Sequence, residues 1–247
     1  MSRIVIFSFS PIFDKNEWKL LSYYEGIANS FLNRGHQILY IITNNFIVDP
    51  WNGNNIGISH FEEERIYLKI KKFSPDLIIS FNNSKLKNIE NKINCPIVIA
   101  EADRWLYFSN KEEIKKNVNK YYFFYFTKNG NRDFINNFNA DPKKIFKIDN
   151  ATSIKNIKLK KKEDINFIGT LYDIDKSKNK LEFKNSNWRY EVLNSLKKFN
   201  LKIYSNYTPE CYRNLLNFIS RNKLYNTKHV QNVYNRSWIS LNIDNLQ

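Results

Sequence analysis

The chain has 247 residues, of which 42% are hydrophobic and 16% aromatic, so it carries enough apolar side chains for a core and is not globally disordered. Its length lies between one large domain and two ordinary ones. No stretch approaches the ~18 uninterrupted apolar residues of a membrane span. The short apolar run at the amino terminus has no small-residue cleavage site behind it, so we expect a cytoplasmic protein.

The formal net charge of +15 attracts phosphate groups in general. The lysines are spread along the chain, however, and no nucleic-acid-binding motif accompanies them. The chain is also rich in Asn, Ile and Lys, a bias that AT-rich genomes impose regardless of function. A membrane that carries anionic lipid is an equally good partner for such a diffuse charge. We expect no nucleic-acid partner and keep open a peripheral contact with the inner face of the membrane.

Short apolar runs alternate with amphipathic segments through the first part of the chain. Strands are predicted at residues 3–9, 37–43, 77–80, 96–100, 121–126 and 145–148, and helices at residues 18–32, 61–73, 112–117 and 131–139. Gly35 follows the first helix at the position where glycine commonly ends one. Strands separated by helices indicate βαβ units, a parallel sheet and right-handed crossovers.

Residues 155–162 hold five lysines in eight positions. This pattern is typical of a solvated interdomain linker, and a membrane or phosphate contact is the alternative. Beyond it the alternation restarts, with strands at 165–169, 201–204 and 239–243 and helices at 188–199, 209–222 and 230–236. We therefore expect one Rossmann-like domain at residues 1–155, a lysine-rich linker at 156–163 and a second such domain at 164–247. The chain stops four residues after the last predicted strand, so we expect the second domain to be incomplete.

The segment Asp-Ile-Asn-Phe-Ile-Gly-Thr-Leu at residues 164–171 is an apolar strand that ends in glycine. Gly169 allows the backbone to turn sharply and to approach a ligand closely. Ligands of open parallel sheets bind beyond the carboxyl ends of the strands. The alternative is an ordinary strand-to-loop glycine that only shapes a turn.

Three segments resemble parts of the GT-B glycosyltransferases. Residues 24–38 (YEGIANSFLNRGHQI) are similar to the first helix and second strand, where a glycine opens the helix and a Gly-His pair closes it. Residues 164–171, followed by 189–196 (RYEVLNSL), resemble the start of the donor domain in the spore-maturation-type family. Residues 229–243 (HVQNVYNRSWISLNI) are similar to a segment in which a tyrosine-rich helix runs into a Leu-Asn strand.

The resemblance implies a GT-B-like α/β fold, with two Rossmann-like parallel-sheet domains facing a cleft. Family members continue past the Leu-Asn strand into a segment that contains glycine and arginine and leads to an acidic residue. This sequence ends before that segment, so we expect a C-terminally truncated relative. The resemblance therefore implies the activity of the parent enzyme and not that of this polypeptide alone.

The resemblance also implies a donor site that needs no bound metal and no cofactor, with the nucleotide sugar as substrate. Backbone amides, helix amino termini and basic side chains then carry the phosphate charge. Arg189 is expected to grip a phosphate with two nitrogens, and a surface salt bridge is the alternative. Tyr234 is equally suited to core packing. The expected donor-binding residues are Gly169, Thr170, Arg189, Tyr234, Ser237 and Asn242.

On the acceptor side, charged residues follow the strand predicted at residues 96–100. Asp103 is the first candidate for the general base that deprotonates an acceptor hydroxyl, and Glu101 is the second. Capping of a helix is the alternative role for Asp103. The expected acceptor-binding residues are Ser8, Phe9, Ser10 and Arg104.

The function that the resemblance implies is transfer of a sugar from a nucleotide-activated donor to a glycan or lipid-linked acceptor in bacterial surface polysaccharide synthesis. A second hypothesis is a non-catalytic GT-B relative that pairs with a full-length transferase or with itself as a homo- or hetero-oligomer. A third is a nucleotide-sugar epimerase. The sequence holds only three histidines, which weakens the third hypothesis.

Overall fold

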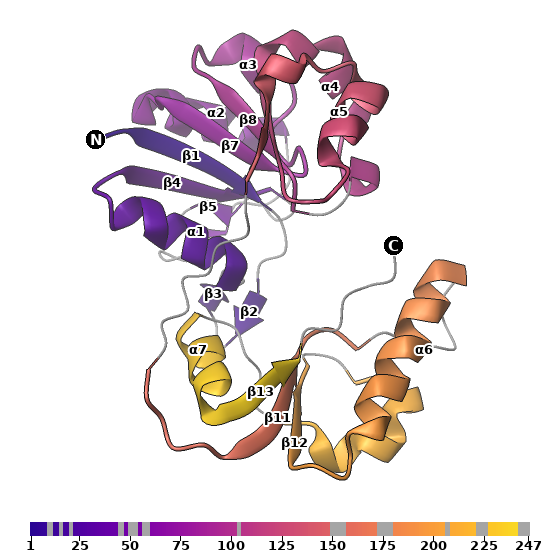
Figure 1. The fold of residues 1–247 in the computed structure, drawn as a ribbon. Coiled ribbons are helices and arrows are strands. Elements are labelled where there is room, and N and C mark those ends of the chain that lie inside the picture. Colours follow the sequence, from indigo (N-terminus) through magenta and orange to yellow (C-terminus); the bar gives the residue numbers. More distant parts are fainter. Residues whose placement is uncertain are drawn as a thin grey trace. The chain divides into compact units, whose positions relative to one another are not determined.

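The computed structural model describes residues 1–8, 12–14, 17–19, 22–43, 47–48, 54–55, 60–102, 105–148, 157–171, 180–205, 208–220 and 227–241. The chain divides into two compact units, Met1–Ser153 and Ile154–Gln247 (Figure 1). Each unit is an α/β structure with a parallel sheet of its own. None of the described helices has the length and apolar character that crossing a bilayer requires.

The sheet of the first unit has the strand order β10-β9-β8-β7-β1-β4-β5-β6. The strands from β10 to β4 are parallel, whereas β5 and β6 are added antiparallel at the edge. The strands are β1 (Arg3–Ser8), β4 (Gln37–Ile42), β5 (Ile47–Val48), β6 (Asn54–Asn55), β7 (Leu77–Phe81), β8 (Ile97–Ala100), β9 (Tyr121–Tyr125) and β10 (Ile145–Lys147).

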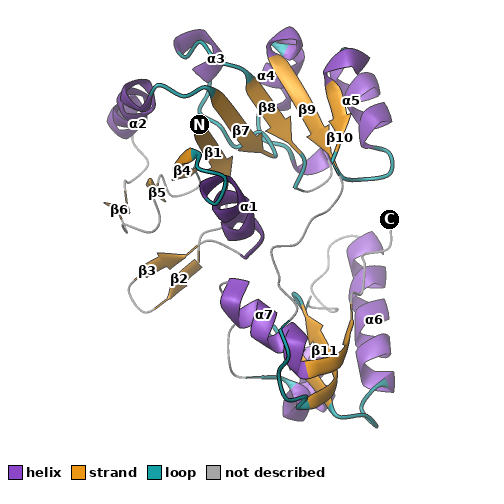
Figure 2. Ribbon diagram, turned by 60° about the vertical axis from the view of Figure 1, so that its left-hand side comes forward, coloured by secondary structure: helices purple, strands orange, loops and turns teal. Residues whose placement is uncertain are grey.

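Helices cover both faces of this sheet, which is why the central strands are continuous apolar runs rather than alternating ones. Val5 and Phe7 of β1 pack in the core under the helices α2 to α5, and Ile4 and Ile6 pack on the opposite face with α1. Figure 2 shows α1 on the face of the strands opposite α2 to α5. The helices are α1 (Ser22–Leu32), α2 (His60–Phe73), α3 (Ile89–Lys92), α4 (Lys111–Lys116) and α5 (Gly130–Phe138).

The first helix begins later than its apolar spacing predicts. Trp18 lies in β3 (Glu17–Lys19), which pairs antiparallel with β2 (Ile12–Asp14). The pairing gives this segment backbone partners of its own, so the stripe of apolar residues becomes helical only from Ser22. The predicted end is confirmed, because Gly35 has the left-handed φ of 82° that favours glycine.

The chain builds this sheet outward from β1 on both sides. The chain crosses from β1 to β4 by way of α1, and from β4 it returns by way of α2 to β7 on the other side of β1. The carboxyl ends of β1 and β7 therefore flank the topological switch point of the sheet. In open α/β sheets this is the position at which ligands bind.

The second unit contains a three-stranded parallel sheet in the order β12-β11-β13. Within the helix predicted at residues 209–222, Glu210–Phe218 instead form a 3-10 helix, in which Tyr212 departs from helical geometry and buries its ring edge-on against Tyr190. The elements are β11 (Glu163–Ile168), α6 (Lys180–Ser195), β12 (Leu201–Tyr204), the 3-10 helix η4 (Glu210–Phe218), α7 (Thr227–Arg236) and β13 (Ser237–Leu241).

Candidate functional site

The loop that follows β11 lies at the carboxyl edge of the second sheet. The Gly169 amide donates to the Tyr204 carbonyl at 3.0 Å, and the Leu171 amide donates to the Ser205 hydroxyl at 3.3 Å. Both acceptors belong to the end of β12 or the residue after it. The loop is thus fastened to the neighbouring strand, and the Thr170 side chain between these two bonds is exposed.

Gly169 is required here by a close aromatic contact. A Cβ at this position would lie 2.7 Å from Cζ of Phe167, well inside van der Waals contact. The Phe167 ring is buried in the core of the unit, so it has little room to give way. The glycine predicted from the sequence therefore has a packing reason, independent of any ligand.

Arg189 of α6 holds this loop from the side of the helix. One terminal guanidinium nitrogen donates to the Thr170 carbonyl at 2.6 Å, and the guanidinium carbon lies 5.6 Å from the centre of the Phe167 ring. The side chain is buried. The structure therefore brings Gly169, Thr170 and Arg189 together, with the arginine bound to the loop backbone. Its grip on a phosphate stays a prediction.

Two other expected donor residues lie at the opposite edge of the sheet. Ser237 is the first residue of β13 and pairs with Glu163, the first residue of β11. Its hydroxyl accepts from the Asn166 side-chain amide at 2.7 Å. Six residues of strand separate Glu163 from Gly169, or about 20 Å. Tyr234 lies in the last turn of α7, just before Ser237, and burial raises the pKa of its hydroxyl.

The structure thus does not bring Tyr234 and Ser237 to the edge that carries the Gly169 loop. Their donor-binding role stays a prediction. Asn242, the sixth expected donor residue, lies outside the described residues.

Ser8 ends β1 beside the switch point of the first unit and is fully buried. Its hydroxyl accepts from the Tyr40 hydroxyl at 2.9 Å, and its carbonyl accepts from the Thr43 amide at 2.9 Å. Burial raises the pKa of Tyr40 well above its ordinary value, so this hydroxyl remains a donor. Ser8 thus ties β1 to β4. The other expected acceptor-side residues Phe9, Ser10, Asp103 and Arg104 lie outside the described residues.

Glu101 follows β8 and is fully buried. Its carboxylate accepts from the amides of Phe126 and Thr127 at 3.0 and 3.2 Å, and from the Thr127 hydroxyl at 3.1 Å. Glu101 therefore fastens the loop after β9 to the end of β8. Its role as general base stays a prediction, and the geometry gives it a positioning role.

Glu101→Gln should lower the free energy of unfolding by about 1–3 kcal/mol, because the amide nitrogen of glutamine would face buried N–H donors and leave one of them unsatisfied. Urea denaturation measures this change. Glu112→Gln is the matched control, since that side chain is 85% exposed. Equal free energies of unfolding for Glu101→Gln and Glu112→Gln would show that the Glu101 contacts do not stabilise the fold.

Two consecutive asparagines at the end of β7 form a feature that sequence reasoning missed. Asn82 and Asn83 have φ of 50° and 56°, a left-handed geometry that asparagine tolerates better than most residues. The Asn82 side-chain oxygen accepts from the Ala102 amide at 2.8 Å, and the Asn83 side-chain amide donates to the Ser109 carbonyl at 2.7 Å. The signal was an Asn-Asn pair directly after an apolar run.

This turn leaves two buried oxygens without a hydrogen-bond partner among the described atoms, the side-chain oxygens of Asn83 and Ser84. Native proteins leave few such atoms unsatisfied. Asn83 and Ser84 follow β7 at the switch point, directly after Asn82, whose backbone amide donates to the Ala100 carbonyl of β8. A water molecule or a ligand hydroxyl would satisfy them.

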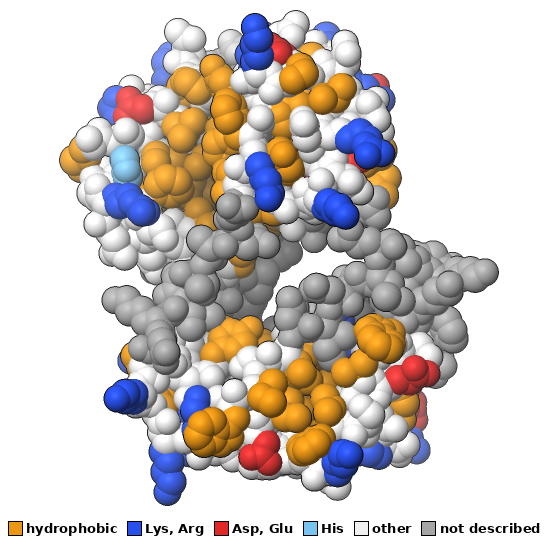
Figure 3. All heavy atoms as spheres, in the orientation of Figure 1, with side chains coloured by type: hydrophobic (Ala, Val, Ile, Leu, Met, Phe, Trp, Pro, Cys, Tyr) orange, Lys and Arg blue, Asp and Glu red, His pale blue; other side chains and the backbone are white. Residues whose placement is uncertain are grey.

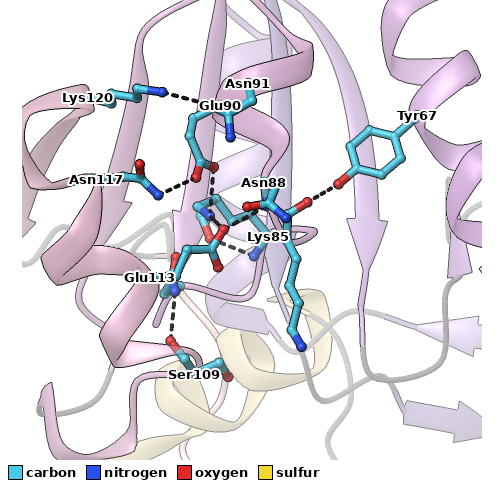
Figure 4. A network of polar contacts seen from close by, with 12 residues as sticks. Tyr67, Lys85, Asn88, Glu90, Asn91, Ser109, Glu113, Asn117 and Lys120 are labelled. Atoms are coloured by element: carbon cyan, nitrogen blue, oxygen red, sulfur yellow. Dashed lines mark hydrogen bonds and ion pairs between the residues drawn. The ribbon is translucent and has the colours of Figure 1, made fainter.

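A buried ionic network follows the same turn (Figure 4). The Lys85 ammonium lies 3.2 Å from a Glu90 oxygen and 3.0 Å from a Glu113 oxygen, and its side chain is fully buried. Asn117 donates to Glu90 at 2.8 Å, and the Asn88 amide donates to Glu113 at 2.7 Å. Because Glu113 belongs to α4, the network fixes the segment after β7 to that helix.

Burial and the charges of this network shift the pKa of Glu90 in opposite directions. Burial alone would raise the pKa of Glu90, but a hydrogen bond from its own backbone and the positive charge of Lys85 together hold this pKa below its ordinary value of 4.5. The glutamate is therefore ionised at neutral pH.

Among the described residues, no three His, Cys, Asp or Glu side chains are arranged to hold a metal ion. Cys95 and Cys211 are free, partly buried thiols. Burial raises the pKa of the Cys95 thiol to about 11, so it stays protonated at neutral pH.

No protein-family model and no curated protein sequence matches the chain. Solved structures do match it. A glycosyltransferase from Rickettsia africae ESF-5 superposes with a TM-score of 0.51 and 12% identity, over 97% of this chain and 72% of that one. The UDP-GlcNAc 2-epimerase from Methanocaldococcus jannaschii superposes with a TM-score of 0.52 and 14% identity, over 96% of this chain and 77% of that one. At such identities the likeness establishes the fold alone, and the chain has a GT-B-like glycosyltransferase fold built from two Rossmann-like α/β units.

Proposed function

We propose that the protein is a transferase that moves a sugar from a nucleotide-activated donor to a glycan or lipid-linked acceptor. The observation that carries the proposal is the loop of Gly169 and Thr170. It lies at the carboxyl edge of β11, the first strand of the second unit, and Arg189 holds it from α6. In a GT-B-like fold this is a suitable place for the diphosphate of a nucleotide sugar.

The chemistry at this loop follows from charge and exposure. A diphosphate beside Thr170 meets an exposed hydroxyl and the positive potential of Arg189. The arginine is buried, so solvent and salt screen its charge less than that of a surface lysine. As the sugar–oxygen bond of the donor breaks, negative charge grows on the departing diphosphate. A cation fixed nearby stabilises that charge in the transition state.

The acceptor hydroxyl must lose its proton as it attacks the sugar carbon. A carboxylate near the carboxyl end of β8 would serve as the general base. Asp103 remains the first candidate for this role, ahead of Glu101. Glu101 is already engaged by three donor groups, which makes it better suited to holding the surrounding loops in place.

Nucleotide binding tests the proposal directly. Purified protein is mixed in turn with UDP, GDP, ADP and CMP, and thermal shift and calorimetry measure binding. A nucleotide at about 100 times its Kd should stabilise the folded protein by about 2.7 kcal/mol. A labelled nucleotide sugar of the same base then reports hydrolysis or transfer. If none of these nucleotides stabilises the protein, the donor-site assignment is wrong.

Arg189→Lys should weaken nucleotide binding at least tenfold, which is about 1.4 kcal/mol. The lysine keeps the positive charge but lacks the planar fork that reaches the Thr170 carbonyl. Calorimetry with the binding nucleotide measures the loss. Arg213→Lys on η4 is the control, because that side chain is 73% exposed and pairs only with Glu210 among the contacts of the described residues. Equal affinities of the two variants would remove Arg189 from the site.

A nucleotide-sugar epimerase is the second candidate function, because the archaeal epimerase matches the chain as well as the transferase does. The two activities differ in their products. Incubation with UDP-GlcNAc and proton NMR would show inversion at C2 of the sugar for an epimerase. For a transferase, UDP release would depend on an acceptor or on slow hydrolysis.

A further inference from the structure

The amino-terminal edge of the second sheet carries an ordered row of lysines. Residues 157–162 contact the end of α7, where the Ile157 amide donates to the Asn235 side chain at 2.9 Å and the Lys162 amide donates to the Arg236 carbonyl at 2.8 Å. These two bonds fix the segment at both ends. The lysine-rich stretch is therefore docked on the second unit along this part of its length.

Partly buried and exposed side chains alternate along this segment. Ile157, Leu159 and Lys161 are partly buried, whereas Lys158, Lys160 and Lys162 are exposed. Lys158, Lys160 and Lys162 thus form a row of exposed positive charge along the segment.

A second group of lysines joins this row at the turn between α6 and β12. The Asn200 side-chain amide of this turn donates to the Lys162 carbonyl at 2.7 Å. Lys197, Lys198 and Lys202 lie on either side of Asn200 in the chain. Residues 157–164 and 197–202 together hold seven lysines and two carboxylates, so the edge is strongly basic.

Exposed apolar side chains accompany these lysines. Trp238 is 72% exposed, Ile239 54% and Phe199 43%. The Lys161 ammonium lies 5.5 Å from the Trp238 ring, and the Lys198 ammonium lies 5.3 Å from the Phe199 ring. Figure 3 shows basic and hydrophobic side chains interspersed over the described face of this unit.

The strand register places both aromatic rings at one end of the sheet. Ile165 of β11 pairs with Leu201 of β12 and with Ile239 of β13. Phe199 and Trp238 come just before these two partners, on either side of β11. Strands are about 4.8 Å apart, so the backbones of Leu201 and Ile239, which follow the two aromatic residues, are about 10 Å apart across the sheet.

We propose that this basic edge, formed by residues 157–162, 197–202, Trp238 and Ile239, docks on a membrane surface that contains anionic lipid. Lysines at a lipid surface keep their charge among the headgroups, while their stems cover apolar surface. Tryptophan prefers the same interfacial depth, because its ring is apolar with one polar N–H. Lysine charge suits a headgroup layer that offers no fixed geometry, whereas Arg forks are the usual readers of nucleic-acid bases.

The edge lies at the opposite end of the sheet from the Gly169 loop. Docking there would leave the carboxyl edge of the second unit free to bind a ligand. The proposal does not depend on transferase activity, since vesicle binding is measured without nucleotide.

Vesicle binding by the full chain tests this surface. Sedimentation with phosphatidylcholine vesicles containing 30% phosphatidylglycerol should show binding that weakens as salt is raised, and vesicles of phosphatidylcholine alone should bind much less. The triple variant K158Q/K160Q/K162Q should bind about a hundredfold more weakly, because each lysine near an anionic surface contributes roughly a factor of five. Lys161 is left unchanged because it donates to the carbonyls of Asn235 and Ser237 at the end of α7.

The matched control is K69Q/K71Q/K72Q, which removes the same charge from exposed positions of α2 in the first unit. Equal losses for the two triple variants would show a diffuse charge effect and overturn the assignment of this edge. W238F should keep the charge and lose the blue shift of tryptophan fluorescence on vesicle addition, and an unchanged blue shift would remove Trp238 from the contact. Tighter binding to a 20-mer RNA or DNA than to vesicles, lost in the K158Q/K160Q/K162Q variant, would assign the edge to nucleic acid and overturn the proposal.

Discussion

Lys85→Met should lower the free energy of unfolding by about 3–5 kcal/mol at neutral pH. The substitution keeps most of the side-chain volume but leaves the carboxylates of Glu90 and Glu113 without their buried cation, and breaking a buried ion pair in this way carries a cost of that size. Urea denaturation followed by circular dichroism measures the loss.

Lys92→Met is the matched control for this change. Lys92 pairs with Glu64 on the surface, where the two side chains are 46% and 59% exposed. An exposed pair of this kind contributes about 0–1 kcal/mol. A loss as small for Lys85→Met as for Lys92→Met would mean that the network in Figure 4 does not stabilise the first unit.

Lys85→Met should also change how the free energy of unfolding depends on pH. In the native protein the pKa of Glu90 lies below its ordinary value of 4.5, so the stability that it contributes is complete above that pH and is lost as the pH falls through the lowered pKa. Without Lys85, burial dominates and the pKa of Glu90 rises. The destabilisation by Lys85→Met should therefore shrink on acidification from pH 7 towards pH 4.5. A gap in stability that stays constant with pH would assign the effect to packing alone.

Gly169→Ala should lower the free energy of unfolding by about 1–3 kcal/mol, as overpacking of a filled core does, and should weaken nucleotide binding. The added methyl group would lie 2.7 Å from the Phe167 ring, so either the ring or the loop must move. If the loop moves, the Thr170 carbonyl leaves its bond with Arg189. Thermal denaturation and calorimetry with the binding nucleotide measure the two effects.

The double variant Gly169→Ala/Phe167→Leu makes room for the methyl group and should recover part of the binding. Gly35→Ala is the control, because nothing lies within 4 Å of a Cβ there and the only cost is the left-handed φ of 82°. That control should lose about 1 kcal/mol of stability and keep nucleotide affinity. Full affinity of Gly169→Ala would separate the loop from the nucleotide site.

The sequence was sufficient to predict the sheets, because buried parallel strands are long apolar runs that local pattern identifies. The strands of residues 3–8, 37–42 and 163–168 occur where they were expected. Strands β2, β3, β5 and β6 were missed, because short antiparallel pairs in polar segments depend on their pairing partner rather than on their own composition. The tandem of two α/β units followed from the strand-helix alternation that restarts after the lysine-rich stretch, and the GT-B-like identity of the fold came from the resemblance; the structure confirms both.

The candidate site was predicted only in part. Gly169, Thr170 and Arg189 come together because one βα connection places them, and such local geometry follows from chain order. Tyr234 and Ser237 were expected beside them, but strand register places Ser237 level with the start of β11. Register cannot be read from residue types alone.

Lys85 left no signal that sequence reasoning could use. A lysine in a polar segment is usually solvated, and its two acidic partners follow five and 28 residues later. The burial of all three depends on how α3 and α4 pack on the sheet. Tertiary structure alone decides whether such a cluster is a surface charge pattern or a buried network.

The position of β1 at the centre of the first sheet governs the order in which this unit can fold. β1 leaves the ribosome before both of its sheet partners, β4 by about 34 residues and β7 by about 73 residues. At about 5–20 residues per second, β1 waits several seconds as an apolar strand with two unpaired edges. Chaperones that bind nascent chains should therefore meet β1 before its partner strands, and synonymous changes that slow translation between β1 and residue 81 should lower the soluble yield more than the same changes placed after residue 81.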